Sequence, residues 1–324
     1  MLQKQFVSRS RTSSSIFALA SYIGVTLGAG PALAIDWSGV DGKTVTLFYP
    51  GQASWEWSLT KADHSGAPKF RGGKNCRGCH EGEEGDIGDL IVSGEKLEPV
   101  PIAGKRRSIP VQIKTAHDAD KLYFQFQWKA QDLPSVAAMD ADDAAKVTVM
   151  LDDGSVVEAA RAGCWGVCHD DATNMASNSG EELEKYLARS RTKLTRSGGG
   201  LNFKSDADLA AMMDGGEYLE YWQAQLNPGA PAKAVSGYIL KDRTEHTPPK
   251  VSATADYKDG VWTVELSRAL QTGDGHYKAL EPEKTYHVGF AIHDAHAANR
   301  FHHVSFEHTL VLDGGDADFV AAMK

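Results

Sequence analysis

One short stretch of the chain has the residue types and spacing of a covalent haem attachment site. In Cys76-Arg77-Gly78-Cys79-His80 two thiols stand three residues apart, and a histidine directly follows the second thiol. Thiols at this spacing form thioether bonds with the haem vinyl groups, and the histidine binds the iron from the proximal side. The alternative is a short-range disulfide beside an unrelated histidine. The pattern favours a c-type haem held by Cys76, Cys79 and His80.

A second stretch repeats this pattern with one extra residue. In Cys164-Trp165-Gly166-Val167-Cys168-His169 three residues separate the cysteines, and a histidine again follows directly. A disulfide between Cys164 and Cys168 would be strained if both lay on one helical turn. A zinc site is the other alternative, but no fourth ligand is evident nearby. We therefore expect a second covalent haem at Cys164 and Cys168, with His169 on its iron.

Each predicted iron needs a sixth ligand if the protein only passes electrons. Six-coordinate iron keeps its geometry between oxidation states and leaves no open position for chemistry. Five of the twelve histidines fall within 16 residues: His293, His296, His302, His303 and His308. A single histidine is more often structural than a ligand. Such a cluster, in a chain that needs two distal ligands, favours ligation by one or two of them.

These histidines lie on two predicted strands joined by a polar turn. Residues 286–293 alternate between apolar and polar side chains, residues 294–299 are turn-like, and residues 301–312 alternate again. On the second strand His302 and His308 share an apolar face, whereas His303 lies on the opposite, polar face.

The rest of the chain looks mainly β. Runs rich in Val, Ile, Thr and aromatic residues predict strands at residues 43–49, 109–114, 122–129, 146–151, 251–257 and 261–267. Helical periodicity at residues 180–195 and 206–224, with a glycine-rich break at 197–200, predicts a small helical insertion at about residues 180–225. Trp55 and Trp57 alternate as on a strand and would be core or haem-wall aromatics. The predicted fold is an antiparallel β-sandwich with this helical insertion and haem-bearing loops.

The first 34 residues have the features of a signal peptide. Lys4, Arg9 and Arg11 form a positive start, an apolar stretch follows, and Ala32-Leu33-Ala34 offers an A-x-A cleavage site. An uncleaved anchor is the alternative, although the apolar run is short for a membrane span. We expect cleavage near Ala34, no stable membrane insertion afterwards, and a mature domain that covers residues 35–324.

The charge balance excludes one class of partner. The 324-residue chain has a net charge of -9, and without its first 34 residues it keeps 31 basic and 43 acidic residues, a net of -12. Proteins that bind nucleic acid neutralise phosphates with a surplus of Lys and Arg. We therefore expect no nucleic-acid partner.

Several segments outside the cysteine motifs resemble the haem-binding subunit of ethylbenzene and dimethylsulfide dehydrogenases. They are a strand with Trp128, the hairpin at residues 257–264, and the ending at residues 289–294 that continues through Arg300 to Ser305. The resemblance covers most of residues 35–324. It implies a β-sandwich that holds one haem between its sheets and carries electrons away from a molybdenum enzyme. In that family the haem is b-type, with methionine and lysine as axial ligands.

This chain departs from the family in its ligands. The family methionine falls in the region of residues 164–169, and the family lysine, three residues before a serine, falls on His302 before Ser305. The resemblance therefore implies a covalent haem with His169 proximal and His302 distal. It places the first haem in an added loop at residues 76–80.

The distal ligand of the first haem has three candidates. His64 lies 12 residues before Cys76 in a polar loop and could fold back over the iron. His293 and His296 would bring the two haems close together, as an electron relay needs, and for that reason we favour them slightly over His64.

Together these features predict a periplasmic diheme c-type cytochrome rather than an enzyme. It would transfer electrons between a redox partner, such as a membrane-anchored quinol dehydrogenase or another redox enzyme, and a downstream acceptor. The alternative is a haem enzyme, a peroxidase or small-molecule reductase, with one open iron. His303 and His308 would then supply acid or base groups.

Overall fold

The computed structural model describes residues 35–132, 138–169, 171–173, 175, 186–193 and 202–324. The predicted signal peptide at residues 1–34, the glycine-rich break at 197–200 and much of the predicted helix at 180–195 lie outside these ranges. The side chains of Trp165 and Cys168 lie outside the described atoms as well.

Residues 35–324 form one compact unit built mainly from strands, as the sequence predicts. The strands are β1 (Lys43–Phe48), β2 (Ser108–His117), β3 (Lys121–Lys129), β4 (Ala145–Asp152), β5 (Val167–Cys168), β6 (Tyr186–Leu187), β7 (Leu219–Leu226), β8 (Lys233–Ile239), β9 (Arg243–Glu245), β10 (Val251–Lys258), β11 (Val261–Ala269), β12 (Tyr286–His293), β13 (His303–Val304), β14 (His308–Leu312) and β15 (Phe319–Met323). The helices are η1 (Trp37–Gly39), α1 (Trp55–Leu59), α2 (Ala67–Arg71), α3 (Arg77–His80), α4 (Glu84–Val92), α5 (Val157–Ala162), η2 (Gly163–Gly166), η3 (Ala188–Ser190) and α6 (Asp206–Asp214).

Nearly all described strands belong to one sheet. Its order is β10-β11-β3-β2-β1-β13-β12-β4-β7-β8-β9, and β14 and β15 fill the space between β12 and β2. The sheet curls, so that β10 lies against β7 and β8 near the other end. The mainly β class is confirmed. In place of two separate sheets the described residues have one curled sheet and the small pair β5-β6.

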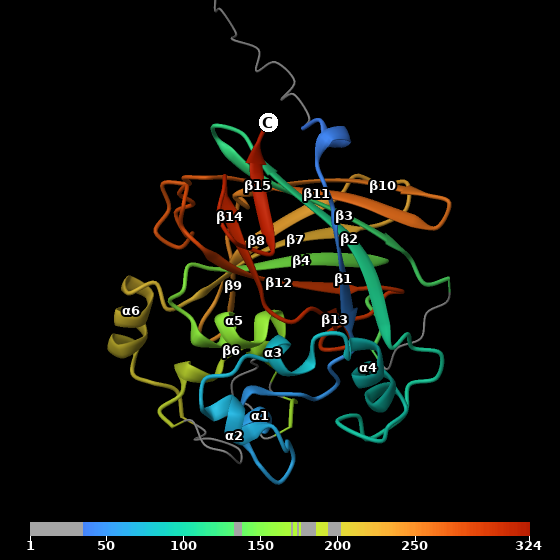
Figure 1. The fold of residues 1–324 in the computed structure, drawn as a ribbon, viewed down its shortest axis with the longest axis vertical. Helices are drawn as coiled ribbons and strands as arrows, with labels where there is room; N and C mark the ends of the chain where they lie inside the picture. Colours follow the sequence, from blue (N-terminus) through green and yellow to red (C-terminus); the bar gives the residue numbers. More distant parts are fainter. Residues whose placement is uncertain (1–34, 133–137, 170, 174, 176–185, 194–201) are drawn as a thin grey trace, which may run out of the picture. The chain divides into compact units, whose positions relative to one another are not determined.

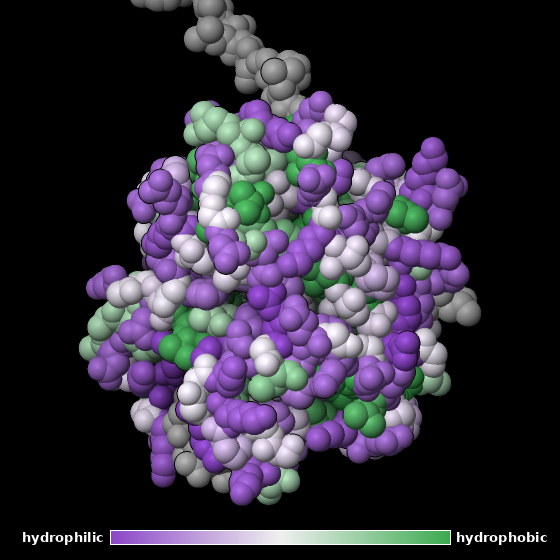
Figure 2. Space-filling view, viewed as in Figure 1, coloured by the Kyte–Doolittle hydropathy of each residue, from purple (hydrophilic) through white to green (hydrophobic). Residues whose placement is uncertain are grey.

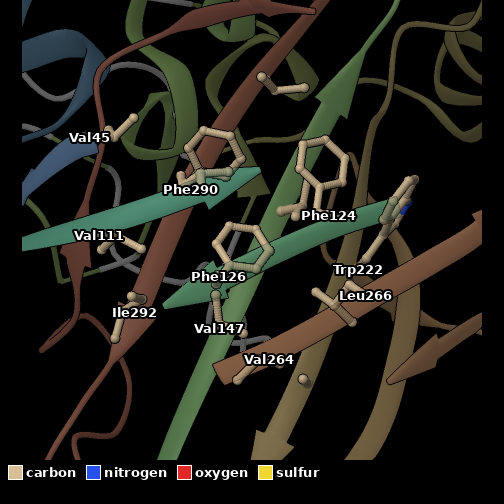
Figure 3. Close-up of a cluster of buried hydrophobic side chains, with 14 of the residues drawn as sticks. Val45, Val111, Phe124, Phe126, Val147, Trp222, Val264, Leu266, Phe290 and Ile292 are labelled. Atoms are coloured by element: carbon tan, nitrogen blue, oxygen red, sulfur yellow. The ribbon is translucent and has the colours of Figure 1, made fainter. Parts of the chain in front are cut away.

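The core lies inside this curl. Phe124 and Phe126 of β3 pack on Phe290 of β12 with ring centroids 6.0 and 5.7 Å apart, and Trp222 of β7 packs edge-on against Phe124. Figure 3 shows these rings among aliphatic side chains from neighbouring strands. Removing such large apolar surfaces from water stabilises the sheet.

Helices α1 to α5 gather at one end of the sheet (Figure 1). Figure 1 shows α1 to α4 together at the end where β1 finishes, with α5 near them. Trp55 and Trp57 belong to α1 rather than to a strand, so that prediction is wrong. The Ser54 side chain caps the helix by accepting a hydrogen bond from the Trp57 backbone N–H.

The predicted helical insertion is only partly helical. α6 covers residues 206–214 and ends at Gly215, and Gly216 follows with a φ of 76°. The helix prediction is wrong beyond that point, because Leu219–Leu226 form β7 between β4 and β8. The aromatic and apolar side chains of this segment are almost all buried in the sheet, and this long-range pairing outweighs local helix propensity.

The histidine-rich segment follows the prediction in its first half. β12 has the predicted bounds, Tyr286–His293. The predicted strand at residues 301–312 breaks instead into β13 and β14, and both pair with β12. Ser305 lies in the break, where its Oγ accepts a hydrogen bond from the Phe290 backbone N–H.

Candidate functional site

The first cysteine motif lies at the wall of a cavity. Cys76 precedes α3 and is buried, Cys79 is exposed, and His80 ends the helix. A cavity of about 430 Å³ opens beside them, and its size is within the range of cofactor sites. Residues from α1 to α4 and from the break after β13 form most of its wall: Trp57, His64, Lys69, Phe70, Lys74, Glu83, Ile87, Leu90, Ile91, Lys96 and Phe306, among others.

His64 faces His80 across this cavity. Their ring centroids are 6.1 Å apart, with an interplanar angle of 34°. Metal–nitrogen bonds of about 2 Å on both sides of one ion place two imidazole centroids roughly 6 Å apart. The pair therefore fits two axial ligands of one iron, and it lies where Cys76 and Cys79 would hold the porphyrin.

Hydrogen bonds orient both rings. The Nδ1–H of His64 donates to the Ser58 carbonyl at 2.9 Å, and the Nδ1–H of His80 donates to Glu83 Oε2 at 2.8 Å. Bonds of this kind fix the tautomer of a ligating histidine and leave Nε2 for the metal. Burial lowers the pKa of His64, which favours the neutral ring that a metal requires.

Aromatic rings flank this pair. Trp57 stacks on His64 with a centroid distance of 5.1 Å, and Phe306 stacks on His80 at 6.3 Å. Gly66 lies close to the distal ring, because a Cβ added there would be 3.0 Å from His64 Nε2. The first site is thus a cavity in which aromatic rings flank two imidazoles that face each other.

The second cysteine motif brings other histidines together. Cys164 is buried in η2, and Gly289 of β12 packs so closely that a Cβ there would be 2.3 Å from the Cys164 backbone nitrogen. The ring of His169 lies 5.4 Å from that of His302, and His293 lies 4.7 Å from His302. The structure therefore groups His169 with the distal ligand that the family resemblance implies, His302.

A buried ion-pair network fixes this second group. Arg300, two residues before His302, donates from Nε to Asp171 Oδ2 at 2.8 Å, and Asp171 lies two residues after His169. The other side of the Arg300 guanidinium donates to Glu98 Oε2 and to the Tyr49 hydroxyl, at 2.8 and 2.9 Å. Burial and the bond to Glu98 raise the pKa of Tyr49, which keeps it a phenol. Arg300 thereby ties the segment of His169 to that of His302.

Two further histidines have backbone partners at this end of the sheet. The His296 Nδ1–H donates to the Asp140 carbonyl at 3.3 Å, and the His303 Nε2–H donates to the Arg106 carbonyl at 2.7 Å. Neither His296 nor His293 is among the residues that line the first cavity. The geometry therefore favours His64, rather than these two, as the partner of His80.

A polar cavity adjoins the second group. It has a volume of about 300 Å³, and His169 and His293 form part of its wall. Donors from three strands line it as well, together with the acids Asp140 and Asp171: Lys146 of β4, Gln223 and Gln225 of β7, and Arg243 of β9. Ammonium, guanidinium and amide groups suit carboxylates such as haem propionates.

The two attachment segments are joined directly. The Cys76 backbone N–H donates to the Arg161 carbonyl in α5 at 2.9 Å, and α5 leads into Cys164. Gly163, with a φ of 64°, lies against the backbone of Phe306 and Glu307; a Cβ there would be 2.7 Å from the Glu307 nitrogen. The two predicted haems are therefore held by neighbouring parts of one substructure.

Some site residues are missed by the sequence patterns. Glu98 and Tyr49 belong to the buried network but stand in no recognisable motif, and Phe306 enters the prediction only as a strand residue. The one available signal is Arg300, which stands in the segment that carries the family resemblance. Their roles depend on contacts between segments about 200 residues or more apart in the sequence.

Comparison with known proteins relates the chain to haem proteins. The family model described as ethylbenzene dehydrogenase matches residues 231–305. Cytochrome c-552 of Stutzerimonas stutzeri is 37% identical over 314 residues, which are 94% of this chain and 98% of the relative. Cytochrome c-551 of Rhodocyclus tenuis is 28% identical over 296 residues, 90% of this chain and 100% of the relative.

Similarity to solved structures is slight. A carbohydrate-binding module of family 9 from Caldicellulosiruptor kristjanssonii, in complex with glucose, covers 63% of this chain and 70% of its own at 10% identity, with a TM-score of 0.30.

Proposed function

Because this chain belongs to the cytochrome family that includes cytochrome c-552 of Stutzerimonas stutzeri, and resembles the ethylbenzene dehydrogenase haem subunit, we propose that it is a diheme electron carrier. Its relatives are named as cytochromes c, and both cysteine motifs suit covalent haem c. The bound haem supplies an iron that changes oxidation state by one electron.

The observation that carries this proposal is the pairing of His64 with His80. Two imidazoles with ring centroids 6.1 Å apart, each oriented through Nδ1, stand next to Cys76 and Cys79 in one cavity. His80 and His64 would together hold the iron of the first haem, His80 from beside Cys79 and His64 from across the cavity. Ligation on both faces leaves no open iron position for a substrate, and this favours electron transfer over peroxidase or reductase chemistry.

The second haem would be held by Cys164 and Cys168, with His169 and His302 as axial ligands. Arg300 keeps these two histidines within reach of each other, and His293 supports His302 from the side. The shared contact between Cys76 and Arg161 brings the two sites together, which suits a relay that takes an electron at one haem and releases it at the other.

We place this relay in the periplasm, after cleavage of residues 1–34 near Ala34. No helix among the described residues is long and apolar enough to cross a bilayer. Figure 2 shows one face of the protein largely covered by hydrophilic residues, with apolar residues in small groups. Such a surface suits brief, salt-sensitive encounters with redox proteins, among them a membrane-anchored quinol dehydrogenase.

The deciding experiment counts the haems and tests their coordination. Protein matured with a c-type assembly system is examined by intact mass, by pyridine haemochrome and by carbon monoxide binding after reduction. We expect two covalent haems and no carbon monoxide complex, because both irons have two histidine ligands. A single haem would overturn the diheme proposal, and rapid carbon monoxide binding would favour the enzyme alternative.

A further inference from the structure

A buried glutamate lies between the two haem attachment segments. Glu307 follows Phe306 of the first cavity, and only 3% of its surface is exposed. Its Oε1 accepts a hydrogen bond from the Arg77 backbone N–H, inside the first cysteine motif, at 3.2 Å. Its backbone packs against Gly163, the residue before Cys164. Glu307 therefore touches both haem-bearing segments, the first through its carboxyl group and the second through its backbone.

The carboxylate of Glu307 is only partly compensated. Among the described residues its second oxygen, Oε2, is buried and has no hydrogen-bond partner. Arg77 is the nearby cation, but its guanidinium is bonded to Asp318 at 2.6 Å and to His308 at 2.9 Å. Burial outweighs these contacts and raises the pKa of Glu307 to about 7.

The charged and titratable groups around Glu307 come from four places. Arg77 and Cys76 act on it from α3 and the residue before it, and Asp318 acts on it from the segment before β15. His308, at the start of β14, contacts the Arg77 guanidinium. Arg161 of α5 lies on the other side of Cys76. Asp318 is already bonded to Lys43 and Arg77, so within the described part of the chain Glu307 is the acid in this group without an ion-pair partner of its own.

We propose that Glu307 is a proton-binding site coupled to electron transfer at the first haem. Glu307 binds one proton from water when the neighbouring haem site accepts one electron from a redox partner, and it releases the proton when the electron leaves. The sum of the two charges is zero, so the buried region keeps its net charge through the cycle. This inference rests on the proposed function, because it requires a haem on Cys76 and Cys79.

The physical reason is the cost of changing charge in a poorly solvated region. An ionised Glu307 stabilises the more positive, oxidised state of the site, and loss of one positive charge nearby raises the affinity of the carboxylate for a proton. The raised pKa means that protonated and ionised Glu307 both occur near neutral pH. The side chain of Arg77, whose backbone contacts the Glu307 carboxyl group, is about one-quarter exposed. Solvent that can exchange the proton therefore lies one residue away.

The test is the pH dependence of the midpoint potential of the first haem, measured by spectroelectrochemical titration from about pH 5 to about pH 9. We expect the wild-type potential to fall as pH rises through neutrality, with a limiting slope of 59 mV per tenfold change in proton concentration. Glu307→Gln keeps the acceptor for Arg77 and removes the titration, so its potential is expected to be independent of pH. Glu307→Asp should restore part of the slope.

A second measurement separates proton uptake from a structural role. The infrared spectrum of the reduced minus oxidised protein is expected to contain the carbonyl stretch of a newly protonated carboxyl group, and Glu307→Gln should lack that band. Glu283→Gln, at an exposed position between β11 and β12, removes the same charge elsewhere and should change neither readout. A slope that persists in Glu307→Gln would assign the proton to another group, such as a haem propionate, and would overturn the inference.

The failure of this inference differs from that of the proposed function. Intact mass shows whether Cys76 and Cys79 carry a haem in every variant. A missing haem there overturns the proposed function and the inference with it. A bound haem with a pH-independent wild-type potential overturns only the proton coupling.

Discussion

The two predicted haem sites are built in different ways. In the first site, the attachment cysteines and both histidines lie within residues 64–80, on α3 and in the turns before α2 and α3, around a cavity that reaches solvent at the exposed Cys79. In the second, His169 meets His302 from a part of the chain more than 100 residues away, and the buried Arg300 network holds them together.

The two sites therefore position their histidines differently, the first by local turns and the second by long-range strand pairing. The first pair depends on local turns, such as the bond between His64 and the Ser58 carbonyl. The second pair depends on the curled sheet, because β12 and β13 must pair before His302 reaches the segment of His169. We therefore expect changes at the first site to have local effects, and changes at the second site to affect the stability of the protein.

The largest expected effect is the loss of a whole haem from one site. The double variant Cys76→Ala/Cys79→Ala should lose the mass of one haem and half of the haem absorbance, and Cys164→Ala/Cys168→Ala should lose the other. Intact mass and pyridine haemochrome measure both. If the second double variant kept its full haem content, Cys164 and Cys168 would not attach a haem. The protein would then have one covalent haem site, at Cys76 and Cys79.

Next in size is the opening of one coordination position. His64→Ala should leave the first iron five-coordinate, so that the reduced protein binds one carbon monoxide, whereas wild type binds none. His302→Ala should do the same at the second site. His296→Ala is the control, because His296 bonds to Asp140 away from the first cavity. Carbon monoxide binding in His296→Ala but not in His64→Ala would reverse our assignment.

A third test compares how much the residues that support each site contribute to the unfolding free energy of the protein. Glu98→Ala leaves the exposed Asp171 as the remaining ion-pair partner of the buried Arg300 guanidinium and should cost about 3 kcal/mol of unfolding free energy. Glu83→Ala removes the exposed partner of His80 and should cost less than about 1 kcal/mol. Denaturant unfolding of the holoprotein measures both. Equal costs would contradict the view that the second site depends on a buried network.

The smallest expected effect is the dependence of the electron-transfer rate on salt, which reports on the charge of the protein surface. Electron transfer with a protein partner should slow as ionic strength rises, because the chain without residues 1–34 has a net charge of -12 and exposed charges are screened by salt. Stopped-flow rates at increasing salt measure this, and electron transfer to a small uncharged oxidant is the control. A rate that does not depend on salt would argue against electrostatic docking.

Much of the fold follows from local patterns. The alternation at residues 286–293 predicts β12 with its observed bounds, and strands β1 to β4, β10 and β11 occur where Val, Ile, Thr and aromatic residues predict them. The two segments whose secondary structure is predicted wrongly have a common feature. Leu219–Leu226 and the Trp55–Trp57 segment have patterns that fit either type of element, and burial against distant strands or a single capping serine decided between them.

The sequence by itself determines the covalent chemistry, because two thiols and a histidine at fixed spacing suit a haem in any fold that exposes them. It also supplies the surplus of histidines. Only the tertiary structure brings His64, rather than His293 or His296, to His80, and it groups His302 with His169 as the family resemblance implies. Such pairing brings together residues that are far apart in the sequence, which costs loop-closure entropy, and the burial of apolar side chains in the whole sheet offsets that cost. No local sequence pattern therefore encodes the distance between two rings.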